Sequence, residues 1–150
     1  MLKIKEQLLQ FCWDGVDART ASLKKRGDEL RESLNSETKS SAGDKHETGR
    51  AMVQLEQEKL GKQLLELEKK RAILQKVDIA KTSAKIVLGS LIKTSLANYF
   101  IAISAGAFQK EGVDVFCISP NAPIAQLLLG KEQGDTTIFN GKKIEILEVL

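Results

Sequence analysis

The chain has little cysteine, histidine or proline. Its 150 residues include two cysteines, one histidine and two prolines. Cys12 and Cys117 lie far apart and match no metal-ligand spacing, so the sequence predicts reduced thiols and no zinc site. Because His46 is the one histidine, a catalytic site of nucleophile, histidine and acid has few candidate residues. These scarcities argue against an enzyme with its own substrate cleft.

Long apolar runs are also missing. No run reaches the roughly 18 residues that a membrane helix requires, and the opening residues 1–7 lack the apolar stretch of a signal peptide. We therefore expect a cytoplasmic protein with no membrane partner. The formal net charge of +3 is too small to indicate duplex nucleic-acid binding by charge alone.

The composition changes near residue 80. Residues 1–80 contain no proline, whereas both prolines and the single tyrosine lie in residues 81–150. The first part is typical of long charged helices. The second is typical of short strands separated by Gly and Asn, so the chain is predicted to have two domains, 1–80 and 81–150.

Apolar residues in the first part repeat at coiled-coil spacing. One row has a period of seven and consists of Leu9, Val16, Leu23 and Leu30, with Leu34 extending it. A second row steps by four, three and seven and consists of Leu60, Leu64, Leu67 and Leu74. The segment between them, 35–50, has no large apolar residue. This pattern predicts an antiparallel helical hairpin whose turn lies near residues 36–46. Each arm would have roughly 30 residues and span on the order of 45 Å.

The second part alternates as strands do. Apolar alternation predicts four strands, at 85–94, 98–104, 113–118 and 143–149, with a turn at Ala97–Asn98 between the first two. A short helix is predicted between the last two strands, at Ala122–Leu129. It would be capped by Ser119 or Asn121 and ended by Gly130. The predicted fold class is α+β. An antiparallel coiled-coil hairpin precedes a small antiparallel sheet that carries one helix.

The segment 118–135 holds the most specific pattern in the chain. It has a Ser-Pro-Asn-Ala-Pro-Ile turn, a helix that ends in Leu-Leu-Leu-Gly-Lys, and a Gly-Asp pair before the last strand. This series resembles the C-terminal domain of the Gre transcript-cleavage factors of bacterial RNA polymerase, and Leu88–Ser90 resembles the start of that domain. The resemblance covers most of residues 85–150. A helical hairpin before this domain fits the same family.

This resemblance implies a fold and a partner. It implies an FKBP-like α+β fold without isomerase activity for residues 81–150. It also implies an accessory factor of bacterial RNA polymerase rather than an enzyme, docked by this domain at the mouth of the polymerase secondary channel. The predicted contact residues lie on the short helix: Ala122, Pro123, Gln126 and Leu127.

Residues 43–48 stand where the family has its acidic hairpin tip, Gly-Asp-x-x-Glu-Asn. Asp44 and Glu47 match the two acidic positions, and their spacing places both carboxylates on one face of a helix. By resemblance they are the catalytic and metal-binding residues. They would help the polymerase active site to hold a second Mg²⁺ and a water that hydrolyses backtracked RNA, so the nascent RNA 3′ end is met only within the complex. The chain needs no cofactor of its own, because the polymerase supplies the other Mg²⁺ ligands.

The tip also departs from the family. Thr48 replaces the Asn, and Gly49–Ala51 replaces an Ala-Glu-Tyr triplet. A structural interpretation of Asp44 and Glu47 is a capping box for the second helix. His46 is either an exposed tip residue or a contact to RNA phosphate.

Three classes of function stay open. The first is a cleavage-stimulating elongation factor, for which we expect a monomer. The second is a secondary-channel regulator that does not cleave, which the residues after Glu47 favour. The third is a self-associating coiled-coil protein with no polymerase role, which exposed apolar heptads would favour.

Overall fold

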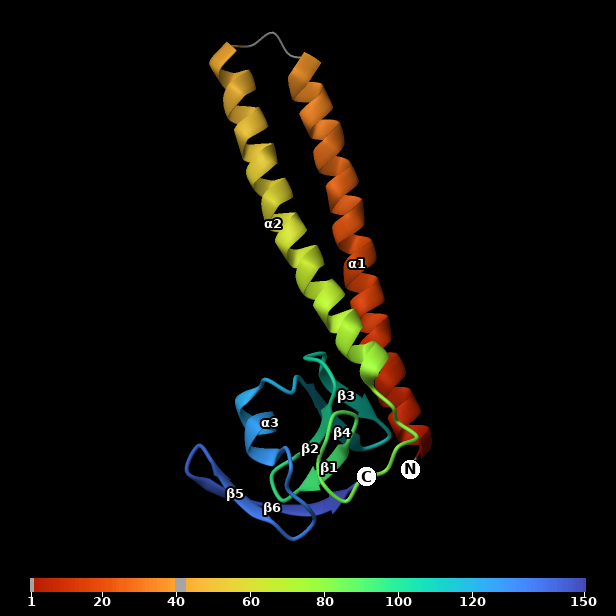
Figure 1. Ribbon diagram of the computed structural model, residues 1–150. Helices are drawn as coiled ribbons and strands as arrows, with labels where there is room; N and C mark the ends of the chain where they lie inside the picture. Colours follow the sequence, from red (N-terminus) through yellow and green to blue (C-terminus); the bar gives the residue numbers. More distant parts are fainter. Residues whose placement is uncertain (1, 40–42) are drawn as a thin grey trace. The chain divides into compact units, whose positions relative to one another are not determined.

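The computed structural model describes the backbone of residues 2–39 and 43–150, and their side chains outside 36–47. Along the chain, two long helices precede a sheet region that contains a third helix (Figure 1): α1 (Leu2–Lys39), α2 (Gly43–Lys76), β1 (Leu91–Thr94), β2 (Asn98–Ile101), β3 (Gly106–Lys110), β4 (Val113–Ile118), α3 (Pro123–Leu128), β5 (Thr136–Phe139) and β6 (Lys142–Val149). The predicted α+β class is confirmed.

The two long helices form the predicted hairpin. Between Val16 and Arg71 they run antiparallel, since Leu60 of α2 reaches Gly27 of α1 and Arg71 reaches Asp17. The seam between them buries five members of the predicted apolar rows: Val16, Leu23, Leu30, Leu60 and Leu67. Three other predicted members are only half-buried: Leu9, Leu34 and Leu64. The helices of 38 and 34 residues are longer than the predicted arms. Polar residues such as Glu and Lys are good helix formers in water, so the polar segment extends both helices rather than ending them.

The sheet has six strands in the order β3-β4-β2-β1-β6-β5. Four neighbouring pairs are antiparallel, but β2 and β4 are parallel, so the prediction of a purely antiparallel sheet is wrong at this pair. The cause is β3, which the sequence analysis missed. It takes the edge, and β4 turns back between β3 and β2, so β4 runs in the same direction as β2.

Strand bounds differ from the predictions in other places. The strand predicted at 85–94 is confirmed only for β1, because residues 87–90 form a turn in which Gly89 has a φ of 91° and Ser90 Oγ accepts a hydrogen bond from the Val87 N–H. The strand predicted at 98–104 ends at Ile101. The bounds of β4 are as predicted, and β6 begins one residue early. The edge strand β5 was not predicted.

Helix α3 packs on one face of the sheet. It buries Ile124, Ala125 and Leu128 against a cluster of sheet and loop residues: Ile86, Ile92, Tyr99, Ile101, Ile144 and Ile146. On β4 the side chains alternate, so Val115 and Cys117 face away from Phe116 and Ile118. The opposite face is covered by the first turns of α1, where the ring of Phe11 meets that of Phe108 with centroids 5.5 Å apart.

By internal contacts, the chain divides into two compact units. One consists of Met1–Gly15 and Ala72–Leu150, and the other of Val16–Arg71. The boundaries of these units differ from the division predicted at residue 80, because the start of α1 and the last residues of α2 belong to the same unit as the sheet. No helix in the described part of the chain is both long and apolar enough to span a bilayer.

Candidate functional site

The predicted acidic pair lies at the start of α2. Helix α1 ends at Lys39 and α2 begins at Gly43, so the backbones of Asp44 and Glu47 belong to the first turns of α2. Their helical spacing of three residues is the one that brings two side chains to the same face. Carboxylates at this end of a helix are also favoured by the helix dipole, so the capping interpretation stays open beside the metal one.

The side chains of Asp44, Glu47 and His46 lie outside the described residues. Their roles in metal binding, capping or RNA contact therefore stay predictions. Among the residues whose side chains are described, no group of three or more His, Cys, Asp and Glu side chains is placed to hold a metal ion. The four residues after Glu47 are helical, with Thr48 and Ala51 exposed.

The predicted docking residues share the outer side of α3. Pro123 and Gln126 are exposed, and Ala122 and Leu127 are half-buried, whereas Leu128 points into the core. Gln126 Nε2 donates a 2.6 Å hydrogen bond to the Pro120 carbonyl and fixes the turn that leads into the helix. Pro123, Gln126 and Leu127 are therefore accessible to a partner, whereas Ala122, the N-cap, packs against the core cluster beneath the helix.

The helix ends only partly follow the prediction. Ala122 is the N-cap with extended backbone and no side-chain cap, so the predicted cap by Ser119 or Asn121 is wrong. Instead, Ser119 Oγ accepts a 3.1 Å hydrogen bond from the Asn121 N–H and shapes the preceding turn. Pro123 takes the first helical position, where a backbone N–H would have no partner within the helix, so its absence costs no hydrogen bond. Gly130, at a φ of 83°, ends the helix as predicted.

The remaining residues of the 118–135 series tie distant segments of the sheet unit together. The Gly130 N–H donates to the Ile86 carbonyl at 2.9 Å, and the Ile86 N–H donates to the Lys131 carbonyl at 2.8 Å. Gly134 donates to the Ile146 carbonyl at 2.8 Å, and Asp135 Oδ2 accepts the Glu132 N–H at 2.9 Å. The Gly-Lys and Gly-Asp pairs therefore connect α3 to the start of the domain and to its last strand.

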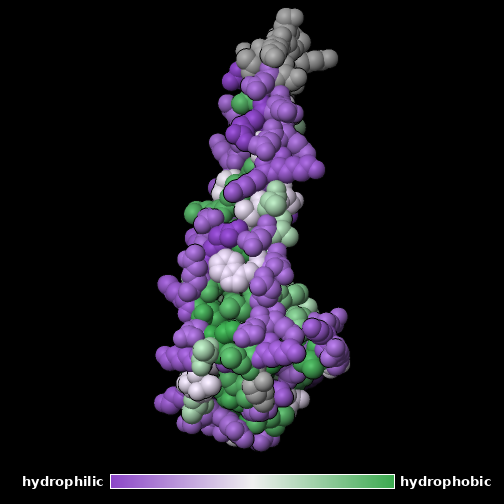
Figure 2. All heavy atoms as spheres, turned by 90° about the vertical axis from the view of Figure 1, so that its right-hand side faces the viewer, coloured by the Kyte–Doolittle hydropathy of each residue, from purple (hydrophilic) through white to green (hydrophobic). Residues whose placement is uncertain are grey.

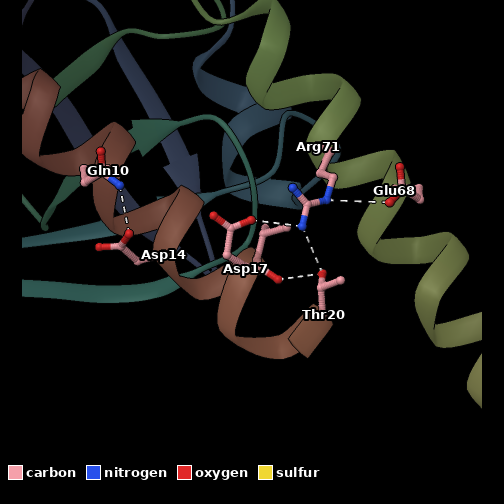
Figure 3. A network of polar contacts seen from close by, with 7 residues as sticks. Gln10, Asp14, Asp17, Thr20, Glu68 and Arg71 are labelled. Carbon is pink, nitrogen blue, oxygen red and sulfur yellow. Dashed lines mark hydrogen bonds and ion pairs between the residues drawn. The ribbon is translucent and has the colours of Figure 1, made fainter. Parts of the chain in front are cut away.

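A polar cluster that sequence reasoning missed lies between the long helices (Figure 3). Arg71 of α2 pairs with Asp17 of α1 at 2.9 Å, donates to Thr20 Oγ1 at 3.3 Å, and lies 3.6 Å from Glu68. Thr20 is buried and its hydroxyl donates to the Val16 carbonyl at 2.8 Å. The signal was present in the sequence, because Arg71 stands seven residues after Leu64, where the heptad pattern calls for an apolar side chain.

The two cysteines meet between the base of α1, which carries Cys12, and β4, which carries Cys117. Neither forms a disulfide, both are buried, and the two thiols are hydrogen-bonded to each other. This hydrogen bond, together with burial, raises the pKa of the Cys117 thiol far above its usual range. Phe11 and Cys12 pack on the sheet. Thiols with a raised pKa are poor nucleophiles, which matches a structural role.

Two further features were not singled out from the sequence. Lys5 is buried, and burial lowers its pKa while the carboxylate of Asp78 opposes the shift. Phe116 is 44% exposed on β4, with its ring 6.2 Å from that of Tyr99. On the face shown in Figure 2, hydrophilic residues cover most of the long helices, and hydrophobic residues gather over the sheet region.

Comparisons with known proteins were made for the whole chain. It matches no protein-family model and no curated protein. Among solved structures, the crystal structure of GreA factor homolog 1 (Gfh1) of Thermus thermophilus aligns with 92% of this chain and 94% of that chain, at 17% identity and a TM-score of 0.38. A second structure, of the transcription factor Gfh1, aligns with 90% of this chain and 92% of that chain, at 18% identity and a TM-score of 0.34.

Proposed function

We propose that this chain is a Gre-type transcription factor that binds bacterial RNA polymerase and acts on its active site as an accessory protein. The observation that carries the proposal is the 118–135 series, read together with the order of elements. A helical hairpin precedes the sheet, and the series forms the turn, the short helix and the glycine links of that sheet. Function inferred from such a resemblance rests on analogy and requires a direct test.

In the proposed complex, the sheet unit docks through the outer side of α3. Pro123, Gln126 and Leu127 are accessible there, beside the half-buried Ala122, and they combine apolar contact area with one amide that still has hydrogen-bonding capacity. Interfaces of this kind gain affinity from apolar anchors and specificity from a few polar groups. Replacing Leu127 by Asp is expected to weaken polymerase binding at least tenfold while leaving the buried face of α3 unchanged.

The proposed chemistry lies with Asp44 and Glu47. Two carboxylates cannot hold Mg²⁺ tightly by themselves, but they suffice when the polymerase supplies the remaining oxygen ligands. Asp44 and Glu47 would help to hold a second Mg²⁺, which would supply a water of lowered pKa for hydrolysis of the RNA phosphodiester. The two residues stabilise charge that develops in the transition state, so their effect should fall on the cleavage rate rather than on binding.

A second candidate function has its own supporting observation. Gly49, Arg50 and Ala51 replace residues that include an acid and an aromatic in the family pattern, so the start of α2 is less acidic. A factor with the same binding mode but too few Mg²⁺ ligands would occupy the secondary channel and slow transcription. This is the non-cleaving regulator.

One experiment separates these functions. Purified polymerase from the same organism, stalled in a backtracked complex, is incubated with wild-type protein, Asp44→Asn or Glu47→Gln, and binding and RNA cleavage are measured together. Glu58→Gln, at an exposed position of α2, is the matched control. Cleavage should fall about 100-fold or more in both tip variants, with binding almost unchanged.

Other outcomes decide among the alternatives. Wild-type protein that binds but cleaves at no Mg²⁺ concentration is the regulator. If both tip variants cleave as well as the wild type does, the pair is only a helix cap. If the protein binds no polymerase and sediments as a dimer or larger species, the self-associating coiled coil replaces both.

A further inference from the structure

The apolar seam of the hairpin does not define a single alignment of the two arms. Its residues repeat every seven positions, with Val16, Leu23 and Leu30 on α1 and Leu60 and Leu67 on α2. Sliding one helix by seven residues would again set apolar residues against apolar residues. Another contact must therefore select the observed register.

The polar cluster around Arg71 makes this selection. In the observed register, Arg71 meets the carboxylate of Asp17 at 2.9 Å and the hydroxyl of Thr20 at 3.3 Å. The Arg71 side chain is only 26% exposed. In any other register Arg71 would keep Glu68 of its own helix but would lose the carboxylate and the hydroxyl across the seam. A partly desolvated guanidinium with fewer partners is costly, so this loss disfavours the other registers.

The two neighbouring registers both remove the partners. Seven residues beyond Asp17 and Thr20 are Lys24 and Gly27, so one slip would set Arg71 against a like charge. Seven residues before them are Gln10 and Trp13, so the opposite slip would replace the carboxylate of Asp17 by an uncharged amide. The observed register is thus the one of the three in which the position that faces Arg71 is an acid.

Gly27 adds a second contact that favours the same register. A methyl group built at Gly27 would lie 3.1 Å from Cδ2 of Leu60, so Leu60 fills space that exists because this position has no side chain. After either slip, Leu60 would face Thr20 or Leu34 instead, and both have side chains there. The close packing at Gly27 and the ion pair of Arg71 therefore favour the same register.

We propose that Arg71, with Asp17 and Thr20 as its partners, is the register-setting residue of the hairpin and so positions the first turns of α2 relative to α1. The consequence for RNA cleavage rests on the proposed function, because a slipped register would displace Asp44 and Glu47. The register itself does not depend on that function. Arg71 is accordingly a positioning residue.

The test measures the register directly in the isolated full chain. Spin labels are attached at Ala18→Cys and Ala51→Cys, two exposed positions on opposite arms, and the distance between them is measured by pulsed electron paramagnetic resonance. The native thiols are buried and react slowly with the label. A seven-residue slip moves one arm by about 10 Å along the other.

The variants separate register from general stability. Arg71→Met keeps the length of the side chain and removes its charge. Lys69→Met is the matched control, because Lys69 pairs at 3.0 Å with Glu66 of its own helix and not across the seam. We expect one narrow distance for the wild type and for Lys69→Met, and a second population shifted by about 10 Å for Arg71→Met. An unchanged single distance in Arg71→Met overturns the proposal.

If Arg71→Met loses helicity, exchanging the charges of Asp17 and Arg71 tests the role of the pair in setting the register. Asp17→Arg alone sets two cations against each other and should broaden the distance distribution. Combining it with Arg71→Asp restores the pair in reverse and should restore the narrow distance. Failure of the exchange to narrow the distribution contradicts a role in register.

The cleavage assay then links the register to the proposed function. Arg71→Met should lower the maximal cleavage rate about tenfold or more while the half-maximal protein concentration stays near the wild-type value, because misplacing reacting groups affects rate more than docking. A shifted distance without a change in cleavage would retain the register role and contradict the proposed role of the tip. An unchanged distance would contradict the register role and leave the tip proposal to its own test.

Discussion

In the unit that contains the sheet, apolar side chains form layers on both faces, under α3 on one side and under the first turns of α1 on the other. In Val16–Arg71 the two helices share one narrow seam, and that seam includes a threonine and an arginine. The two units differ in where polar groups lie. Side chains at the edge of a two-helix seam keep access to water, so Arg71 can lie there with part of its side chain exposed. In the described part of the sheet unit, the buried polar residues lie outside the hydrophobic cluster beneath α3: Lys5, Ser90 and Thr94.

The largest effect should come from enlarging a cavity in the sheet core. Ile146 is fully buried beneath α3, and Ile146→Ala should lower the free energy of unfolding by about 3–5 kcal/mol. Leu67→Ala in the hairpin seam should cost only about 2 kcal/mol, because water and neighbouring side chains can fill an open seam. Urea denaturation followed by circular dichroism measures both. Equal losses would mean that the seam is packed as tightly as the sheet core.

A substitution in one turn compares the two β-hairpin loops of the sheet unit. Both two-residue hairpin loops have positive φ, at Glu111 and Gly112 between β3 and β4, and at Asn140 and Gly141 between β5 and β6. Such turns favour Asn-Gly, which only the second loop has. Glu111→Asn should therefore raise the free energy of unfolding by about 1 kcal/mol. Glu132→Asn, in the loop after α3, is the control and should not stabilise the protein.

Glycine substitutions compare positions within the hairpin. A methyl group at Gly61 meets no atom within 4 Å, so Gly61→Ala should stabilise the protein by about 0.5–1 kcal/mol through helix propensity. Gly27→Ala should gain less or lose stability, because its methyl group would press on Leu60. Thermal unfolding of the two variants side by side checks this order. A larger gain at Gly27 would show that Leu60 moves aside freely, and would weaken the packing argument for the register.

The smallest effect concerns Lys5, at the base of α1. Burial lowers its pKa, so between that lowered value and the ordinary value near 10.4 the unfolded chain binds more protons than the folded one. The stability of the wild type relative to Lys5→Met should therefore rise as the pH increases through that window. Burial raises the pKa of Tyr99, which lowers stability above about pH 10, but this effect is common to both proteins and cancels. A pH-independent difference would contradict the burial effect.

Several local features were predictable from the sequence because their causes lie within a few residues. A seven-residue apolar repeat and the absence of proline predicted the two helices and their seam. Gly130 predicted the end of α3, although the predicted cap at its start was wrong, and clean alternation from Lys143 to Val149 predicted the last strand. The spacing of Asp44 and Glu47 placed the candidate acidic pair in one helical segment, since helical neighbours are set by sequence distance alone.

Other features depended on contacts between distant residues. Strand β3 buries only Phe108, and β5 leaves Ile138 68% exposed, so neither shows the alternation that identifies a strand from sequence. They form because β4 and β6 supply hydrogen-bonding partners beyond the Glu-Gly and Asn-Gly turns. Insertion of β4 between β3 and β2 then makes one pair parallel.

Elements whose residues contact each other along one helix or one strand follow from the amino-acid sequence. Which elements become neighbours depends on contacts across the fold: the direction of β4, the meeting of Cys12 with Cys117, and the partners of Arg71. In the hairpin this is because a repeat of seven is satisfied by several alignments of two helices. The alignment is then selected by an ion pair and a close contact between residues that lie far apart in the chain.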